Sequence, residues 1–208
     1  MPLNQAEAGT INTRIAEIEA RTGVRVTTMI VARSDAYLEL PWKAFALGSS
    51  LAAFATVLAN GWGQQWTAQG ATLLDAIAIL GVGATSALAA VWVPAWARLF
   101  LSPARRDVEV RQYAQAAFLT RELFRTPQRT GLLILVSRFE RKIQLLPDTG
   151  FRERVSASDW HTVIARMTPP LRASRPSRAL QEGLLALEDL LVRKGFVGAP
   201  PVDGEALE

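Results

Sequence analysis

The sequence predicts an α/β fold, a small mixed sheet flanked by helices, which is interrupted by a two-helix transmembrane hairpin. Two observations support this prediction. Charged side chains are missing from Ala44–Leu74 and, after Asp75, again from Ala76–Ala97. On both sides of this region, short apolar or β-branched runs alternate with segments of helical periodicity. The chain therefore combines a membrane element with one α/β domain.

The composition sets outer limits on function. The 208 residues suit one small domain with a membrane element. The absence of cysteine excludes disulfides and thiolate catalysis, and a single histidine, His161, excludes a histidine-cluster metal site within one chain. We interpret His161 as a surface or capping residue. The net charge of +4 and the pI near 10.1 are compatible with nucleic acid, anionic lipid or simple solubility.

The two uncharged runs have the length of membrane spans. A helix needs about 20 mostly apolar residues to cross the hydrocarbon core, and Pro41–Trp62 and Thr72–Ala95 both reach this length. The connector Gly63–Gly70 is polar and short, so the spans are antiparallel. A pair of buried helices in a soluble core is the alternative, which the lack of charge on every face disfavours.

Aromatic and basic residues indicate the orientation of the hairpin. Tryptophans at the ends of both segments match interfacial belts, and basic residues flank only the outer ends of the hairpin. We therefore expect both termini to lie in the cytoplasm. Small residues at four-residue spacing, which permit close helix packing, occur in both spans: Gly48, Ala52 and Thr56 in the first, and Gly83 and Ala87 in the second.

The flanking segments predict the α/β domain. We expect helices over about 10–22, 105–125 and 177–194, and a further helix capped by Ser158 that is broken at Pro169-Pro170. Strands are expected at Val24–Ala32, Gly131–Ser137 and Lys142–Leu146. Because a single strand before the hairpin needs partners, we expect residues 1–40 and 97–197 to form one discontinuous cytoplasmic domain around a hairpin at 41–96, followed by a disordered tail at 198–208.

The stretch Arg129–Ile143, a buried strand, a turn and a second strand, resembles the core of the TPM-domain family. Three further features are similar to the membrane-anchored bacterial branch of that family: the run Ala20-Arg21-Thr22-Gly23 before the first strand, Asp148-Thr149-Gly150, and Trp160. This similarity implies a location in the bacterial inner (plasma) membrane. The resemblance implies a compact α/β sandwich. Members are mostly membrane-associated proteins of obscure role, and a chloroplast branch has been assigned phosphatase activity. The acidic Asp-Pro-x-Gly opening of many members is missing here, which counts against a family metal or phosphatase site.

Two groups of side chains are candidates for a site. Glu140 and Asp148 flank the last strand and are expected to converge at one sheet end, where their oxygens could bind a hard cation, Ca²⁺ or Mg²⁺; solvated turn carboxylates are the alternative. Four arginines bound the buried strand and form either an anion site or, the interpretation we favour, a basic surface facing lipid headgroups: Arg125, Arg129, Arg138 and Arg141.

These observations lead to two functional hypotheses. The first is a noncatalytic, membrane-anchored TPM-like module that acts as an assembly, quality-control or scaffold factor, with no catalytic or cofactor-binding residues. Its partners would be the lipid bilayer and other membrane proteins, and not nucleic acid, because the aromatics belong to membrane edges and core. The alternative is a membrane-anchored phosphohydrolase that uses the arginines with Glu140 and Asp148.

Overall fold

A three-stranded sheet forms the centre of the larger of the two units into which the chain folds. The structure, a computed structural model, describes residues 5–62 and 69–198. Unit 1 comprises Met1–Ser34 and Val108–Glu208, and unit 2 comprises Asp35–Asp107. The chain therefore leaves unit 1 after its first strand and returns to it before the second. The connector at 63–68 and the predicted tail beyond residue 198 lie outside the described residues.

The sheet joins segments from both sides of the hairpin. Its strands are β1 (Arg25–Val31), β2 (Gly131–Ser137) and β3 (Lys142–Pro147), in the order β1-β2-β3. β1 pairs with β2 in parallel, with Ile30 opposite Val136, and β2 pairs with β3 antiparallel. The predicted pairing of the strand before the hairpin with the strand after it is confirmed. β2 lies in the centre and is buried along its whole length, because helices cover both faces.

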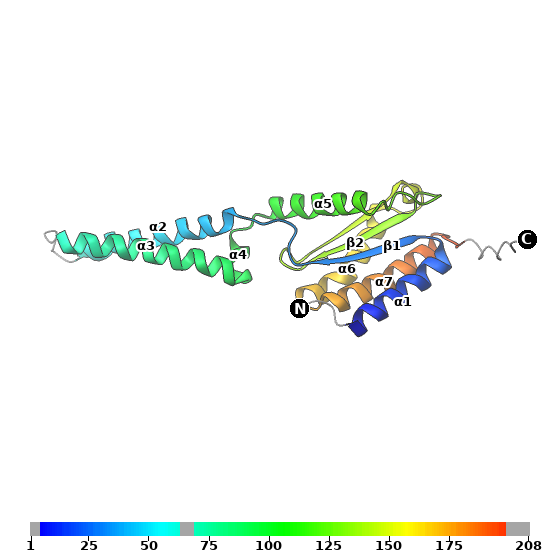
Figure 1. The fold of residues 1–208 in the computed structure, drawn as a ribbon, viewed down its shortest axis with the longest axis horizontal. Helices are drawn as coiled ribbons and strands as arrows, with labels where there is room; N and C mark the ends of the chain where they lie inside the picture. Colours follow the sequence, from blue (N-terminus) through cyan, green and yellow to red (C-terminus); the bar gives the residue numbers. More distant parts are fainter. Residues whose placement is uncertain (1–4, 63–68, 199–208) are drawn as a thin grey trace, which may run out of the picture. The chain divides into compact units, whose positions relative to one another are not determined.

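Unit 1 has three layers (Figure 1). On one face of the sheet, Leu133 and Leu135 pack against Val110, Ala114 and Phe118 of α5 (Pro103–Thr120). The opposite face, which carries the alternate residues of each strand, packs against three helices. These are α1 (Gln5–Thr22), α6 (Ala157–Arg172) and α7 (Pro176–Arg193), and the 3-10 turn η1 (Thr149–Phe151) precedes α6. The structure thus confirms the mixed α/β class.

Ion pairs join the three helices of this layer. Glu188 of α7 is 5% exposed and forms ion pairs with Arg14 and Arg21 of α1. At the other edge of α7, Lys194 pairs with Asp159 of α6, with 2.7 Å between Nζ and Oδ2. A buried carboxylate is stable only when its desolvation is offset by such partners. The three-helix layer is therefore held by paired charges in addition to its apolar contacts.

The starts and ends of two helices differ from the prediction. Ser156, and not Ser158, caps α6, because its side chain and that of Asp159 complete a reciprocal capping box. The helix also continues through Pro169 and Pro170. Both prolines lie in its last turn, and the carbonyl oxygens that lose their N–H donors belong to residues on the exposed side of the helix. α1 begins at Gln5, so Thr10 lies inside the helix and its hydroxyl donates to the carbonyl oxygen of Ala6.

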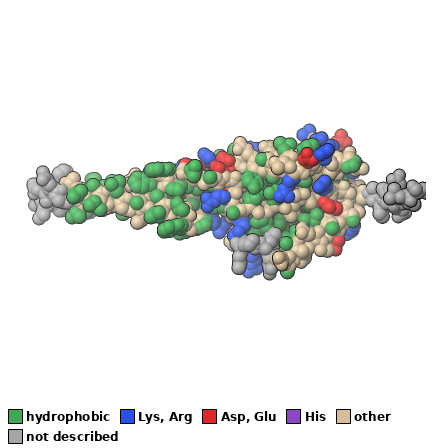
Figure 2. Space-filling model, viewed as in Figure 1, with side chains coloured by type: hydrophobic (Ala, Val, Ile, Leu, Met, Phe, Trp, Pro, Cys, Tyr) green, Lys and Arg blue, Asp and Glu red, His purple; other side chains and the backbone are tan. Residues whose placement is uncertain are grey.

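Unit 2 is a helical hairpin of α2 (Glu39–Trp62) and α3 (Gln69–Trp92), followed by the short helix α4 (Pro94–Leu99). Within these helices, Glu39–Gly61 and Thr72–Trp92 are long and apolar enough to cross a membrane, and only 11% of each apolar window is buried. Figure 2 shows hydrophobic side chains over the visible face of the hairpin. The helices therefore lack the burial of soluble core helices.

Small residues line the contact between α2 and α3, as predicted for Gly48 and Gly83. Both glycines are buried, and a Cβ atom built on Gly48 would lie 3.3 Å from the Cα atom of Gly83. The Ser86 hydroxyl donates to the carbonyl oxygen of Ala44 at 2.9 Å. Near the connector, the Asn60 side chain donates to Asp75 at 2.8 Å. Close approach of the two backbones turns the large side chains outward.

Candidate functional site

The carboxyl ends of β1 and β2 lie side by side because the strands are parallel, and ligand sites in α/β folds gather at such ends. The pairing extends past the strands, since the N–H groups of Arg138 and Phe139 donate to the carbonyl oxygens of Val31 and Ala32 at 3.0 and 2.9 Å. The chain then turns back into β3 at Arg141, which has a φ of 49°. The turn 138–141 is therefore fixed beside the end of β1.

Glu140 is the buried carboxylate of this turn. It is 2% exposed, and its oxygens accept hydrogen bonds from the Ser34 N–H group, at 2.8 Å, and from the Ser137 hydroxyl. The Ser34 hydroxyl is buried without a hydrogen-bond partner among the described residues. In the same turn, the Phe139 ring centre lies 5.2 Å from the Arg33 guanidinium. The carboxylate thus ties the end of β1 to the β2–β3 turn.

Asp148 occupies the opposite end of the sheet, after β3. Its carboxylate accepts from the Arg129 guanidinium at 2.9 and 3.2 Å and from the Thr149 N–H group at 2.7 Å, so it also caps η1. Arg129 has a φ of 54° and its guanidinium lies 5.9 Å from the Phe124 ring centre. Asp148 is 7% exposed, and a bidentate arginine pair is a strong partner for a buried carboxylate.

The two carboxylates predicted to converge are not brought together. Glu140 precedes the six-residue strand β3 and Asp148 follows it, and a rise of about 3.3 Å per residue puts roughly 20 Å between them. The expectation of one shared sheet end is wrong because the residues sit at the two ends of one strand. No group of three or more potential metal-ligating side chains occurs in residues 5–62 and 69–198.

The four predicted arginines are likewise divided by β2. Arg125 and Arg129 precede the strand, where Arg125 pairs with Glu122 at 2.7 Å and Arg129 with Asp148. Arg138 and Arg141 follow it, at the carboxyl end. The arrangement therefore offers two separate basic regions instead of one cluster. The region at the carboxyl end is the larger, because it is joined by arginines from α6 and α7.

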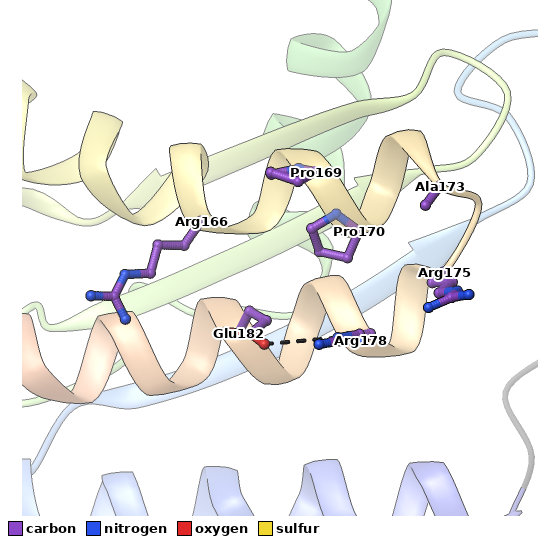
Figure 3. Close-up of a pocket in the computed structure, with 7 residues that line it drawn as sticks. All are labelled: Arg166, Pro169, Pro170, Ala173, Arg175, Arg178 and Glu182. Carbon is purple, nitrogen blue, oxygen red and sulfur yellow. Dashed lines mark ion pairs between the residues drawn. The ribbon is translucent and has the colours of Figure 1, made fainter.

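A groove at this carboxyl end brings those arginines together. It is lined by the end of β1, the N-terminus of α1, Arg138 and the connection from α6 to α7, including Ser174, Arg175 and Arg178. A neighbouring hollow shares Arg175 and Arg178 and adds Arg166, Pro169 and Pro170 (Figure 3). Our sequence reasoning missed Arg166, Arg175 and Arg178. The run Leu171–Arg178, with three arginines in eight residues, was the available signal.

Acidic residues also line this groove. Glu182 forms an ion pair with Arg178 at 3.8 Å, marked in Figure 3. Glu7 accepts a hydrogen bond from the Ser177 hydroxyl at 3.0 Å. Together the two hollows place Arg138, Arg166, Arg175 and Arg178 against these two carboxylates. The surface therefore retains a positive balance and favours anions.

A carboxylate with a perturbed pKa, Asp159, lies away from this groove, at the start of α6. The Lys194 ammonium group, through its hydrogen bond, and then Ser156 hold the pKa of Asp159 well below its ordinary value. Asp159 lies in the N-terminal capping box of α6, and the Lys194 that contacts it follows the last residue of α7. This perturbed carboxylate is accounted for by helix capping and by an ion pair, both of which stabilise the charged form.

The fold and the comparisons define the class of protein. The chain carries an α/β/α sandwich whose first two strands are separated by an inserted helical hairpin. Residues 91–190 match the family model TPM_phosphatase, described as the TPM domain. This match confirms the resemblance to the TPM-domain family that was inferred from the sequence.

A solved structure supports the same fold. The NMR structure of the BA42 protein from the psychrophilic bacterium Bizionia argentinensis aligns with a TM-score of 0.55 at 13% identity, covering 100% of this chain and 92% of that one. At this identity the likeness concerns the fold alone. No curated protein matches the chain.

Proposed function

We propose that this chain is a membrane-anchored TPM-type module that acts as a noncatalytic assembly, quality-control or scaffold factor for other membrane proteins. One observation carries the proposal. A hairpin of two long apolar helices is inserted between β1 and β2 of a TPM-type α/β fold. An insertion at this point leaves the sheet intact while it fixes the domain to whatever surface holds the hairpin.

The outward face of the hairpin supports a bilayer as that surface. Large apolar side chains are exposed along both helices, including Leu51, Phe54 and Val57 of α2 and Leu74 and Leu80 of α3. Apolar surface of this extent is costly in water. In a bilayer the same side chains face hydrocarbon, and small residues mediate the contact between helices.

The flanking charges support one orientation. Lys43, Arg98, Arg105 and Arg106 lie near the ends of the helices that are remote from the connector. Arg105 pairs with Asp35 and Glu39 at 3.3 and 3.2 Å. By the positive-inside rule these ends are cytoplasmic. We therefore propose that unit 1 and both termini lie in the cytoplasm and that the hairpin spans the bacterial inner membrane.

Partner identification tests the proposed role. The full-length protein would be purified from membranes after in-cell crosslinking, with a second preparation that carries charge reversals on unit 1, such as Arg175→Glu with Arg178→Glu. A scaffold factor is expected to enrich the same few membrane proteins in repeated preparations. Recovery of lipid and detergent alone, with no protein enriched over an unrelated two-span control, would contradict the proposed role.

The name of the family model, TPM_phosphatase, favours a second candidate function. A membrane-anchored phosphohydrolase would use Glu140 or Asp148 with nearby arginines and a bound Ca²⁺ or Mg²⁺. The geometry offers two separate sites for this chemistry: Glu140 beside Arg138 and Arg141, and Asp148 beside Arg129. In both, the carboxylate oxygens already accept hydrogen bonds from the protein, which supports the noncatalytic role.

A phosphatase assay separates the two candidates. Purified full-length protein would be assayed on a generic aryl phosphate with added Ca²⁺ or Mg²⁺. If the protein is a noncatalytic scaffold, the unmodified protein is expected to hydrolyse the substrate no faster than the Glu140→Gln and Asp148→Asn variants. Robust metal-dependent turnover that either substitution abolishes, in a variant that remains folded, would overturn the noncatalytic proposal and identify the sheet end that carries the chemistry.

A further inference from the structure

We infer that the groove lined by Arg138, Arg175 and Arg178, together with the adjoining Arg166, docks the phosphate headgroups of anionic phospholipids in the membrane that holds the hairpin. We call this surface the arginine groove. The inference rests on the proposed function, because it requires the hairpin to span a bilayer. It goes beyond that function by assigning a lipid class to a surface of unit 1.

Ion pairs leave part of the positive charge at this end of unit 1 unmatched. At the amino end of β2 and around the neighbouring helix ends, four basic side chains are matched by carboxylates: Arg125 with Glu122, Arg129 with Asp148, Arg21 with Glu188, and Lys194 with Asp159. In the arginine groove, Arg166 and Arg175 are exposed and have no carboxylate within 4.0 Å among the described residues. With these two residues, the arginine groove therefore holds exposed guanidinium groups that are free to bind an anion.

The local geometry suits a phosphate group. Guanidinium groups bind phosphate oxygens through paired hydrogen bonds. α7 begins in the groove with Pro176 at its first position, and its N-cap residue, Arg175, makes no side-chain cap hydrogen bond. The side chain of Arg175 therefore accepts no hydrogen bond from the first-turn N–H groups, and the helix dipole adds positive potential at the same place. Arginine side chains and a helix N-terminus favour an anion together.

The short link between β1 and α2 limits the distance between the end of β1 and a membrane that holds α2. The groove includes Ile30 and Ala32 at the end of β1. Only residues 35–38 separate Ser34 from Glu39, the first residue of α2. A fully extended link of this length spans at most about 17 Å. If α2 enters the bilayer, the end of β1 is held within that distance of the headgroup region, where an anionic leaflet attracts basic side chains.

Site-specific fluorescence tests the inference in the full-length chain. Because the sequence has no cysteine, Ala173→Cys in the adjoining hollow provides a single labelling site for an environment-sensitive fluorophore. The protein would be reconstituted into nanodiscs of phosphatidylcholine with or without phosphatidylglycerol, and quenching by a headgroup-labelled lipid would be measured. Quenching is expected to increase with phosphatidylglycerol and to fall when salt is added, because the attraction is screened.

Matched variants connect the response to the groove. A basic side chain near an anionic surface contributes about 1 kcal/mol, or about fivefold in the ratio of docked to undocked states. Arg175→Gln with Arg178→Gln is therefore expected to lower that ratio by more than about tenfold. The control, Arg121→Gln with Arg152→Gln, makes the same charge change near the opposite end of the sheet and is expected to keep the response.

Each result has one interpretation. Quenching that is equal with and without phosphatidylglycerol, or that persists in the groove variant, would overturn headgroup docking. A response that requires a co-reconstituted membrane protein instead of phosphatidylglycerol would also overturn it in favour of a protein partner. Release of the protein from native membranes by alkaline extraction would instead show that the proposed membrane anchoring has failed, independently of the lipid.

Discussion

The carboxylate of Glu140 accepts a hydrogen bond of 2.8 Å from the backbone N–H group of Ser34, a residue 106 positions earlier in the chain. Ser34 is the last residue of unit 1 before the hairpin. The same carboxylate accepts from Ser137, at the end of β2. A single side chain in the β2–β3 turn thus fixes the point where the chain leaves the domain, next to the central strand.

Replacing Glu140 with alanine is expected to destabilise unit 1 by about 2–4 kcal/mol, because two buried donors lose their acceptor. Glu140→Gln keeps an acceptor oxygen and is expected to cost less. Urea unfolding of the detergent-solubilised full-length protein would measure both changes. Glu153→Ala, at an exposed position, is the control. Equal stability of the Ala variant and the control would contradict the structural role of Glu140.

The shared sheet predicts a long-range effect of β1 on the segment after the hairpin. Ile30 is only partly buried, whereas Val26 is 4% exposed and packs in the main core. Val26→Asp is therefore the sharper test, with an expected cost of several kcal/mol for burying an unpaired carboxylate. Limited proteolysis would reveal the loss of stability as new cleavage sites within residues 108–194. Retained protection of that region, matching the exposed control Arg25→Asp, would argue for two independently folded pieces.

Two glycines of α3 make a matched pair for testing the hairpin contact. A Cβ atom on Gly83 would approach the Phe45 ring to 2.9 Å, whereas a Cβ atom on Gly81 meets nothing within 4 Å. Gly83→Ala is expected to weaken the packing of α2 on α3 by about 1–3 kcal/mol through overpacking. Gly81→Ala should be neutral or slightly stabilising, because alanine favours the helix. The midpoint of unfolding in an SDS titration compares them, and equal midpoints would refute the predicted contact.

Asp159 predicts an acid-dependent loss of stability. Its pKa is lowered in the folded protein from an ordinary value of 3.8, chiefly by the hydrogen bond from Lys194 and then by Ser156. As the pH falls below that ordinary value, the unfolded chain binds the proton first, so the stabilisation present at neutral pH is lost. Asp159→Asn should therefore reduce the acid sensitivity of the free energy of unfolding. Urea titrations of both proteins at neutral and acidic pH would measure the free energy of unfolding. If the pH dependence were the same in Asp159→Asn, the proposed contribution of Asp159 to acid sensitivity would be contradicted.

The proposed orientation predicts opposite labelling of two introduced cysteines. Gln65→Cys is in the connector and Glu153→Cys is on the exposed surface of unit 1. On intact cells, a membrane-impermeant thiol reagent should label Gln65→Cys and spare Glu153→Cys, because positively flanked ends stay in the cytoplasm. Permeabilised cells, where both should react, provide the control. The reverse pattern on intact cells would invert the topology.

The sequence by itself determined those features that depend on local periodicity and composition. The two uncharged runs predicted α2 and α3, and the uninterrupted apolar run Gly131–Ser137 predicted a strand buried on both faces. Small residues at four-residue spacing predicted the close approach at Gly48 and Gly83. The sequence also predicted that the strand before the hairpin pairs with this buried strand, because unpaired backbone groups need hydrogen-bond partners.

Only the tertiary structure decided which side chains meet. Glu140 and Asp148 are close in sequence, but an extended strand carries them to opposite ends of the sheet, so nearness in sequence was a poor guide to a shared site. Conversely, Arg138 and Arg175 are far apart in sequence and line one groove, because β2 ends where α6 turns into α7. Contacts of this kind depend on how strands and helices pack across the whole domain, which no local pattern records.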